Sequence, residues 1–349
     1  MKLVYDNIVY SLQQAGGIST YWAELSSRLI RDNYDISFIE QENSNIIRQT
    51  LPIKDNQLLL QNVKYSQILS RFLPVNLNVS NEKFIFHSSY NRVTNNINAV
   101  QVTTVHDFVH EKYYGGLRKL IHSYQKNKSI NAAQKIIAVS ENTKRDLLEI
   151  HPKIDPSKIE VIYNGVSEDF FIIDKAVDGA KPYLLFIGSR EHYKNFNFVV
   201  ELLKEASGFD LYIIGKPLLK DEEKLLLRSI PGRFKLFTNI DNKSLNVIYN
   251  EAFALIYPSS YEGFGIPLLE AMKAGLPFIA LNKSSIPEVA GRAGELIDEL
   301  SIDGFKQALN RIANARNDYV LKGLKQAQFF SWEKCYQKTI SLYHNLVLK

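Results

Sequence analysis

The decisive stretch lies in the second half of the chain, where residues 258–275 read PSSYEGFGIPLLEAMKAG. The apolar run Phe253–Tyr257 precedes it and is typical of a buried strand. Gly263 and Gly265 allow a tight turn and a close approach of the backbone to a ligand. Pro267 suits the first position of a helix, and Gly275 suits its carboxyl-terminal cap. The stretch therefore predicts a strand, a glycine turn and a helix whose free amide groups form an anion site.

Two carboxylates flank this anion site, Glu262 in the turn and Glu270 in the helix. A carboxylate beside a phosphate repels it, so we expect both side chains to accept hydrogen bonds from hydroxyl groups. Their placement suits a sugar on one side of the anion site and a ribose on the other. The alternative is that Glu262 is a solvated loop residue and that Glu270 only compensates the helix dipole.

Short apolar runs alternate with helical patterns along the whole chain, which is the signature of parallel sheets in the α/β class. The second half carries six such runs, at 183–187, 210–214, 234–238, 253–257, 277–281 and 294–297. The first half carries six more, at 2–6, 35–39, 83–87, 100–105, 135–139 and 158–163. Each half thus has the strand number of a doubly wound, Rossmann-like sheet.

The domain boundary is expected between residues 166 and 181, where Asp174, Gly179 and Pro182 interrupt or close the pattern. We predict an amino-terminal domain at 1–166 and a carboxyl-terminal domain at 167–332. A last helix at 333–349, preceded by Ser331 as a candidate cap, follows a completed second domain. It needs a surface to pack on, and we expect it to return to the first domain.

Composition restricts the class of protein. A chain of 349 residues with 45% hydrophobic and 23% charged residues suits two globular domains. The single cysteine, Cys335, excludes a disulfide framework and a cysteine-based metal cluster, and suits a reducing compartment. We find neither a signal peptide nor an apolar run of membrane-spanning length, and expect a cytoplasmic protein. The net charge of +5 does not indicate nucleic-acid binding.

The spacing of Glu262 and Glu270 resembles the Glu-x7-Glu motif of the retaining glycosyltransferase family 4, whose members have the GT-B fold. That fold has two Rossmann-like domains that face each other across a cleft. Further matches cover most of the chain. They are GGISTY at 16–21, VHDFVHE at 105–111, VSENTK at 139–144, VIYNGV at 161–166 and GSREHYKN at 188–195.

Within the family, the pattern is most similar to bacterial mannosyl- and rhamnosyltransferase-like enzymes of surface polysaccharide synthesis. One departure is SSIPE at 284–288, where many relatives carry Gly-Gly before the Pro-Glu pair.

The resemblance implies roles for individual residues. Arg190 and Lys194, which follow the predicted strand at 183–187, would hold the diphosphate of a nucleotide sugar. His106, at the end of another predicted strand, would face the donor sugar. The predicted catalytic residues are therefore His106, Arg190, Lys194 and Glu262. The predicted donor-binding set comprises Gly16, Gly17, Gly188, Arg190, Lys194, Glu262, Gly263, Phe264, Gly265, Ile266 and Glu270.

Each of these roles has a plainer alternative. Arg190 and Lys194 could be an ordinary solvated pair, and Gly16-Gly17 a plain turn. His106 could be structural, and Asp107 and His110, which stand in the same matched stretch, carry still weaker signals of function.

The predicted chemistry needs neither a cofactor nor a metal. The sequence has no Asp-x-Asp motif and no His/Asp cluster with metal spacing, so the cations and helix amides would replace Mg2+. The family implies retention of anomeric configuration. Because no carboxylate is an obvious covalent nucleophile, we expect a front-face ion-pair route in which the departing phosphate takes the proton of the acceptor. GDP-mannose is the favoured donor and a UDP-sugar the alternative, with a glycan or lipid-linked acceptor.

Three other classes of protein compete with the glycosyltransferase interpretation. A Rossmann dehydrogenase fails because no strand is followed by Gly-x-Gly-x-x-Gly with an acidic residue about 20 positions on. A non-catalytic nucleotide-sugar-binding protein and a GT-B epimerase remain as alternatives. The presence of Glu262, Glu270, Arg190 and Lys194 favours the transferase over both.

Residues 112–145 form a basic segment to which the predicted transfer reaction assigns no role. Eight basic side chains stand there against a single acidic one, Glu141. Apolar residues recur at helical spacing within it, namely Tyr113, Tyr114, Leu117, Leu120, Ile121 and Tyr124. Such a helix can lie on an anionic membrane, here the inner face of the plasma membrane. The alternative is that the apolar stripe packs into the domain core.

Overall fold

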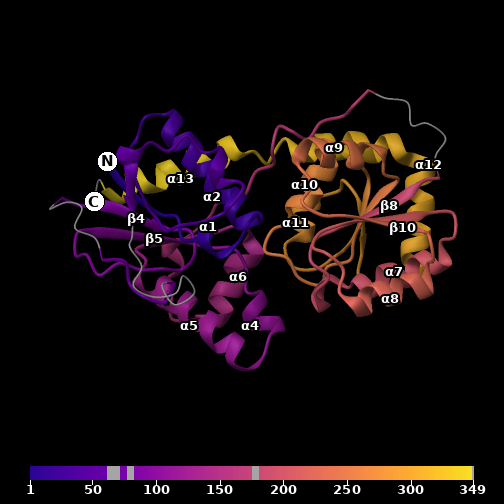
Figure 1. Cartoon of the computed structure of the whole chain (residues 1–349), viewed down its shortest axis with the longest axis horizontal. Coiled ribbons are helices and arrows are strands. Elements are labelled where there is room, and N and C mark those ends of the chain that lie inside the picture. The colour runs from indigo at the N-terminus through magenta and orange to yellow at the C-terminus, as the bar shows by residue number, and fades with distance from the viewer. Residues whose placement is uncertain (61–70, 77–81, 175–180, 348–349) are drawn as a thin grey trace. The chain divides into compact units, whose positions relative to one another are not determined.

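A computed structural model of the chain describes all residues except 61–70, 77–81, 175–180 and 348–349. The chain forms two compact units (Figure 1). Met1–Asn164 and Trp332–Lys349 make the first unit, and Gly165–Ser331 make the second. Part of the interrupted pattern from which the boundary was predicted, including Gly179, lies outside the described residues.

A parallel sheet of seven strands forms the centre of the first unit, in the order β3-β2-β1-β4-β5-β6-β7. Its strands are β1 (Lys2–Asp6), β2 (Asp35–Glu40), β3 (Leu58–Leu60), β4 (Phe84–Ser88), β5 (Ala99–Val105), β6 (Lys135–Ala138) and β7 (Ile159–Val161). The six predicted strands are all present, with ends that differ by two residues or fewer. The edge strand β3 was missed, because three residues are too few to show an alternating pattern.

The described helices of the first unit are α1 (Val9–Leu12), α2 (Gly17–Arg31), α4 (Val109–Tyr113), α5 (Gly116–Ala132), α6 (Glu141–Ile150) and α13 (Trp332–Val347). Short 3-10 turns lie at Arg48–Thr50, Asp55–Gln57 and Pro156–Lys158. Helix α2 buries one face, with Tyr21, Trp22, Leu25 and Leu29 fully covered. This apolar stripe is the main reason why α2 forms where it does.

Helix α13 belongs to the core of the first unit although it follows the second unit in sequence (Figure 1). It packs against α2 and β4. The hydroxyl of Tyr343 lies 2.6 Å from the Tyr5 hydroxyl and 2.6 Å from Nδ1 of His87. All three side chains are buried, and burial lowers the pKa of His87 to about 3, so its ring is neutral at physiological pH.

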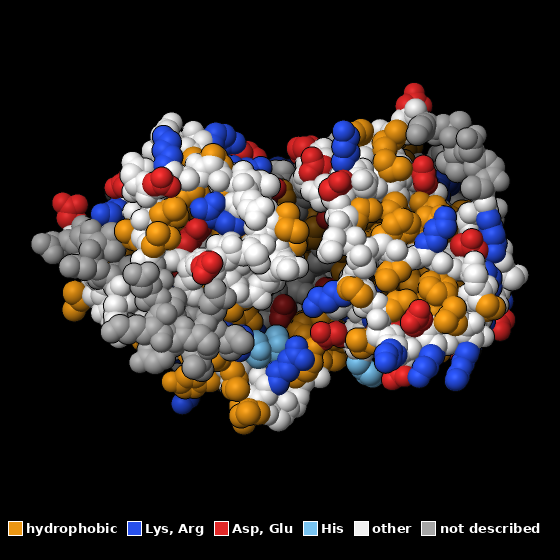
Figure 2. Space-filling model, in the orientation of Figure 1, with side chains coloured by type: hydrophobic (Ala, Val, Ile, Leu, Met, Phe, Trp, Pro, Cys, Tyr) orange, Lys and Arg blue, Asp and Glu red, His pale blue; other side chains and the backbone are white. Residues whose placement is uncertain are grey.

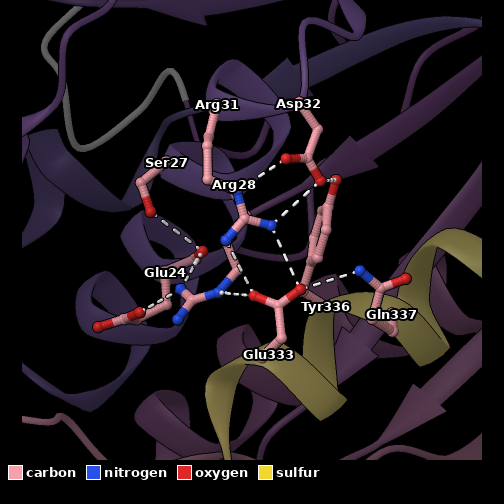
Figure 3. Close-up of polar contacts among 8 residues, drawn as sticks. All are labelled: Glu24, Ser27, Arg28, Arg31, Asp32, Glu333, Tyr336 and Gln337. Carbon is pink, nitrogen blue, oxygen red and sulfur yellow. Dashed lines mark hydrogen bonds and ion pairs between the residues drawn. The ribbon is translucent and has the colours of Figure 1, made fainter.

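A polar cluster at the surface joins α2 to α13 (Figure 3). Glu333 accepts hydrogen bonds from Arg28 Nε at 3.1 Å and Arg31 Nη1 at 3.0 Å. The hydroxyl of Tyr336 donates to Asp32 at 2.7 Å. Such exposed pairs contribute about 0–1 kcal/mol each, so the buried apolar face of α13 supplies most of the stabilisation and the cluster fixes its rotation.

The second unit is built on a parallel sheet of six strands in the order β10-β9-β8-β11-β12-β13. They are β8 (Tyr183–Ile187), β9 (Asp210–Ile214), β10 (Phe234–Phe237), β11 (Ala254–Tyr257), β12 (Phe278–Leu281) and β13 (Glu295–Ile297). Its helices are α7 (Phe196–Glu205), α8 (Lys220–Ser229), α9 (Asn242–Glu251), α10 (Ile266–Lys273), α11 (Ile286–Ala290) and α12 (Ile302–Ala327). All six strands were predicted.

Strand order decides where a site can form in each unit. In the second unit the order reverses between β8 and β11, which pair directly. The loops that follow these two strands leave the same edge of the sheet in opposite directions, and the crevice between them is the usual ligand site of such folds. In the first unit the corresponding reversal lies between β1 and β4.

Candidate functional site

The glycine turn after β11 has the predicted form. Gly265 precedes α10 with a φ of 109°, in the left-handed region that favours glycine. Pro267 is the second residue of α10 rather than the first, because the helix begins at Ile266. Gly275, with a φ of 69°, follows the end of the helix. The amide groups of the first turn of α10 thus lie beside the loop that carries Glu262.

Two serines hold this turn in place. The buried hydroxyl of Ser285 donates to the carbonyl oxygens of Glu262 and Phe264, both at 2.9 Å. Ser284 Oγ accepts from the Glu262 amide at 2.8 Å. These are the two residues at which the sequence departs from the Gly-Gly pair that the resemblance implies. Ser284 has a φ of 50°, which explains why glycine also suits that position.

Asn195 links the loops that follow β8 and β11. It ends the 3-10 turn His192–Lys194 in the left-handed conformation, with a φ of 53°. Its side-chain amide donates to the Pro258 carbonyl at 2.7 Å and to Ser260 Oγ at 2.8 Å. The two loops at the point of strand reversal therefore form one hydrogen-bonded structure.

Lys194 and Glu262 form an ion pair through Nζ and Oε1. Each side chain is only 12% exposed, so solvent screens their attraction less than at the surface. The Lys194 ammonium also lies 5.5 Å from the ring centres of Tyr193 and Tyr257. Burial, together with the Glu262 carboxylate, raises the pKa of Tyr257 well above its usual value. Glu262 is therefore a partly buried carboxylate, held in place by Lys194, and is not a solvated loop residue.

Arg190 is held by groups of the second unit that the sequence did not point to. Its Nε donates to Glu222 Oε2 at 2.8 Å, and its Nη2 donates to the carbonyls of Lys216 and Pro217 at 3.0 and 2.8 Å. The side chain is 4% exposed, and Nη1 is buried with no hydrogen-bond partner among the described residues. Arg190 is thus a cation in a fixed position, and its Nη1 can still donate a hydrogen bond to a ligand.

Gly188 and Gly215 allow the backbone to pass closely beside Arg190. Gly188 has a φ of 124°, again in the left-handed region. A Cβ added to Gly215 would lie 2.6 Å from the Gly188 carbonyl oxygen and 3.3 Å from Nη1 of Arg190. A side chain at Gly215 would therefore displace the loop that carries the predicted diphosphate ligands.

Glu270 lies in the second turn of α10, where its Oε2 accepts a hydrogen bond from the Tyr249 hydroxyl at 2.7 Å. Burial raises the pKa of Glu270 to about 7, and the Tyr249 bond opposes this rise. A ligand that donates hydrogen bonds to this carboxyl group would stabilise its charged form and lower its pKa again.

The first unit carries the remaining predicted residues. Gly16 precedes α2, and a Cβ there would lie 2.9 Å from Oε1 of Gln13. His106 follows β5 and meets the Tyr21 ring edge-on, with centroids 5.0 Å apart. Burial lowers the pKa of His106 to about 4, so the ring is neutral at physiological pH.

His106 lines a cavity of about 80 Å³ with residues that sequence reasoning missed. These include Tyr90 and Asn91 after β4, and His122 on α5. The ring of His122 stacks on that of His110, with centroids 3.8 Å apart. No motif links His122 to His110, so only the packing of α4 against α5 brings them together. Ile18, next to the Gly16-Gly17 pair, lines the same cavity.

Neither a membrane span nor a metal cluster is found in the part of the chain that the structure describes. None of its helices is long and apolar enough to cross a bilayer. Among the described residues, no group of three or more His, Cys, Asp or Glu side chains is placed to hold a metal ion.

Two family models match consecutive parts of the sequence. The model of Glycosyltransferase Family 4 matches residues 15–170, and the model of Glycosyl transferases group 1 matches residues 167–321. The chain belongs to glycosyltransferase family 4. It is a glycosyltransferase with the GT-B fold, as the sequence predicted.

Curated relatives and solved structures agree with this family. O-antigen chain mannosyltransferase B of Escherichia coli is 29% identical over 270 residues, 69% of each chain. O-antigen chain mannosyltransferase RfbU of Salmonella typhimurium is 26% identical, over 65% of this chain and 67% of its own. HepE of Anabaena, solved in complex with UDP-glucose, matches with a TM-score of 0.74 and 13% identity, over 99% of this chain and 100% of its own.

Glu270 provides a test of the site's electrostatics. Its folded pKa of about 7 lies above its ordinary value of 4.5, so its contribution to stability is complete below pH 4.5 and is lost as the pH rises to 7. Glu270→Gln keeps an acceptor for Tyr249 and carries no charge. We expect this variant to be more stable than the wild type at pH 8, by about 3 kcal/mol, and equally stable at pH 4.5. Urea unfolding measures both, and a difference that does not change with pH would contradict the assignment.

Proposed function

We propose that the chain is a retaining, metal-independent mannosyltransferase that moves mannose from GDP-mannose to a glycan or lipid-linked acceptor in bacterial surface polysaccharide synthesis. The observation that carries this proposal is the Lys194–Glu262 pair beside the amino end of α10, at the strand reversal of the second unit. The mannosyltransferases of Escherichia coli and Salmonella typhimurium support mannose as the sugar. The alternative donor is a UDP-sugar, which HepE with its bound UDP-glucose supports.

The diphosphate of the donor would compete with Glu262 for Lys194. A diphosphate carries more negative charge than one carboxylate, and the amides of α10 and the spare Nη1 donor of Arg190 favour it further. Lys194 would then turn to the diphosphate, and Glu262 would be free to accept hydrogen bonds from the sugar hydroxyls. Glu270, with its raised pKa, would bind the ribose hydroxyls in the same way.

The same groups account for transfer without a metal. As the bond between the anomeric carbon and the diphosphate oxygen breaks, negative charge grows on that oxygen, where Arg190, Lys194 and the α10 amides stabilise it. The acceptor hydroxyl attacks from the same face, and its proton passes to the departing oxygen. One glycosidic bond forms, one bond to phosphate breaks, and the configuration is retained.

Replacing Glu262 tests the catalytic assignment. We expect Glu262→Ala to lower kcat by about 10²-fold or more, because the donor sugar loses its charged acceptor. GDP should still bind, since the diphosphate ligands remain. Glu270→Ala should weaken GDP binding as well. Nucleotide release and calorimetric titration with GDP and UDP measure these effects.

Glu168→Ala is the matched control, because Glu168 is exposed and pairs with Lys273 at the other end of α10. Its activity should equal that of the wild type. Wild-type turnover by Glu262→Ala would show that Glu262 has no role in the reaction.

The metal-independent route makes a separate prediction. Transfer in the presence of saturating EDTA should proceed at the untreated rate, since Arg190, Lys194 and the α10 amides supply the positive charge. The measurement is the initial rate of nucleotide release with and without chelator, and with Mg2+ restored. Loss of the chemical step on chelation and its return with Mg2+ would refute the proposal.

We also propose that α5 docks the enzyme on the inner face of the plasma membrane, so that it works in the cytoplasm on a membrane-held acceptor. Leu117, Leu120 and Tyr124 are 71, 67 and 66% exposed, so this part of the predicted stripe does not pack into the core. Figure 2 shows hydrophobic side chains with Lys and Arg beside them in the lower part of the first unit, where α4 and α5 lie in Figure 1. Arg118 and Lys119 are the exposed basic residues of this surface.

One residue of the basic segment does not belong to this surface. Lys126, which the sequence placed among the basic side chains available to a membrane, is buried. Its ammonium pairs with Glu111 at 2.8 Å and donates to the Asp107 carbonyl at 2.7 Å. The reason is its place on the inward face of α5, which a count of charges does not reveal.

Vesicle co-sedimentation tests the docking. We expect the protein to bind phosphatidylglycerol vesicles but not phosphatidylcholine vesicles at low salt. The double change Arg118→Glu and Lys119→Glu should weaken binding at least about tenfold, since each basic residue contributes about 1 kcal/mol near an anionic surface. The control is Lys153→Glu with Lys158→Glu, which makes the same change in charge at exposed positions outside α5. Equal losses in both variants, or no binding by the wild type, would exclude docking through α5.

A further inference from the structure

A chain of buried hydrogen bonds runs from the last helix to the cavity that His106 lines. The hydroxyl groups of Tyr5 and Tyr343 lie 2.6 Å apart, and the Tyr343 hydroxyl lies 2.6 Å from Nδ1 of His87. Nε2 of His87 lies 3.0 Å from Thr104 Oγ1. Thr104 is one of the residues that line the cavity, so the chain connects α13 to the cavity wall through the core of the first unit.

The partners of Tyr5 fix the direction of this chain. Tyr5 is fully buried, and among the described residues its hydroxyl has no hydrogen-bond partner other than Tyr343. Because a buried donor without an acceptor is unfavourable, Tyr5 donates to the Tyr343 oxygen. Tyr343 in turn donates to Nδ1 of His87, which is then the unprotonated ring nitrogen. Burial keeps the His87 ring neutral, with a pKa of about 3, so its proton is on Nε2, and Nε2 donates to Thr104.

Thr104 extends this constraint to Tyr21 and His106. Its Oγ1 lies 3.2 Å from the Tyr21 hydroxyl, and Tyr21 is fully buried. The other part of Tyr21, its ring, meets the His106 ring edge-on. Neither ring nitrogen of His106 has a hydrogen-bond partner among the described residues. The contact with Tyr21 therefore positions the His106 ring and leaves its nitrogens available to a ligand.

We infer that Tyr343 is a positioning residue of the transferase, which fixes the His87 ring and thereby orients the Thr104 hydroxyl and the Tyr21 ring against which His106 packs. The inference rests on the proposed function and on the predicted place of His106 at the donor sugar. Tyr343 is fully buried and touches no ligand itself. A displaced His106 would lower the rate of transfer more than the affinity for the donor, because the transition state depends more strongly on geometry than the ground state does.

NMR of the histidine ring nitrogens tests the chain without any substrate. In wild-type protein labelled with nitrogen-15 histidine, His87 should have a protonated Nε2 and an unprotonated Nδ1 at neutral pH. Tyr343→Phe keeps the ring and removes the hydroxyl that donates to Nδ1, so it should shift the ring signals of both His87 and His106. A protonated Nδ1 in the wild type, or unchanged His106 signals in Tyr343→Phe, would overturn the inference.

Kinetics test the effect on the reaction. The assay is the release of nucleotide from GDP-mannose or a UDP-sugar, with water as the acceptor. Tyr343→Phe should lower kcat about three- to tenfold and leave KM nearly unchanged. Tyr336→Phe is the matched control, because it removes another hydroxyl of α13, which donates to Asp32 at 2.7 Å and lies outside the chain. It should leave kcat and the His106 signals unchanged. A merely structural role for Tyr343 would lower the thermal stability of both variants and the kcat of neither.

Variants of Thr104 separate the hydrogen bonds from simple packing. Thr104→Val keeps the shape of the side chain and removes the hydroxyl, so it should lower kcat, and Thr104→Ser should recover most of that loss. Combining Thr104→Val with Tyr343→Phe should lower kcat no further than Thr104→Val alone, because both changes break the same chain. Losses that multiply in the double variant would contradict the inference. If the wild type releases no nucleotide, the proposed function fails, whereas the His106 signals of Tyr343→Phe and Tyr336→Phe still decide whether Tyr343 positions that ring.

Discussion

The hydrogen bonds that hold the turn between β11 and α10 are the constraint on which the rest of the proposed donor site depends. A buried strand delivers this turn to the sheet edge, where its backbone groups need partners. Ser285 supplies one hydroxyl to two carbonyls, and Asn195 supplies an amide from the loop after β8. Without these bonds neither the α10 amides nor Glu262 would have a defined position, and the proposed donor could not be held between them.

The cations of the site are held in a different way from the turn. Lys194 and Arg190 are nearly buried and each is paired with a carboxylate, Glu262 and Glu222. An unpaired charge at such depth would be strongly unfavourable, so the free protein needs these partners. The two pairs are not equivalent, however. Glu222 also accepts from the Leu219 amide at 2.9 Å and is fixed to α8, whereas Glu262 is itself a proposed ligand of the sugar. Arg190 is therefore the fixed cation, and Lys194 is the cation whose partner would change when the proposed donor binds.

The secondary-structure elements could be predicted from the sequence, but the side-chain contacts between distant elements could not. The twelve predicted strands, the glycine turn and the family could be predicted because apolar periodicity and glycine positions are local signals. The partnership of Arg190 with Glu222 joins residues 32 positions apart, and no pattern marks it. Lys126 is a second example. The sequence predicted it to be exposed because it lies on a basic helix, but it is on the inward face of α5 and pairs with Glu111. Ser284 and Ser285 were a departure without an explanation until their hydroxyls were placed.

The last helix shows how the order of the chain affects the first unit. Tyr343 closes a buried network with Tyr5 and His87, so β1 and β4 do not have all their partners until the end of the chain has been made. The chain passes from the first unit to the second near residue 164 and returns near residue 332. Because burial holds His87 neutral, the network gives a stability that is present at neutral pH and is lost as the pH falls below the ordinary pKa of histidine toward about 3. The first unit, with its glycine loop and the cavity that His106 lines, therefore depends on residues that lie after the whole proposed donor site in the sequence.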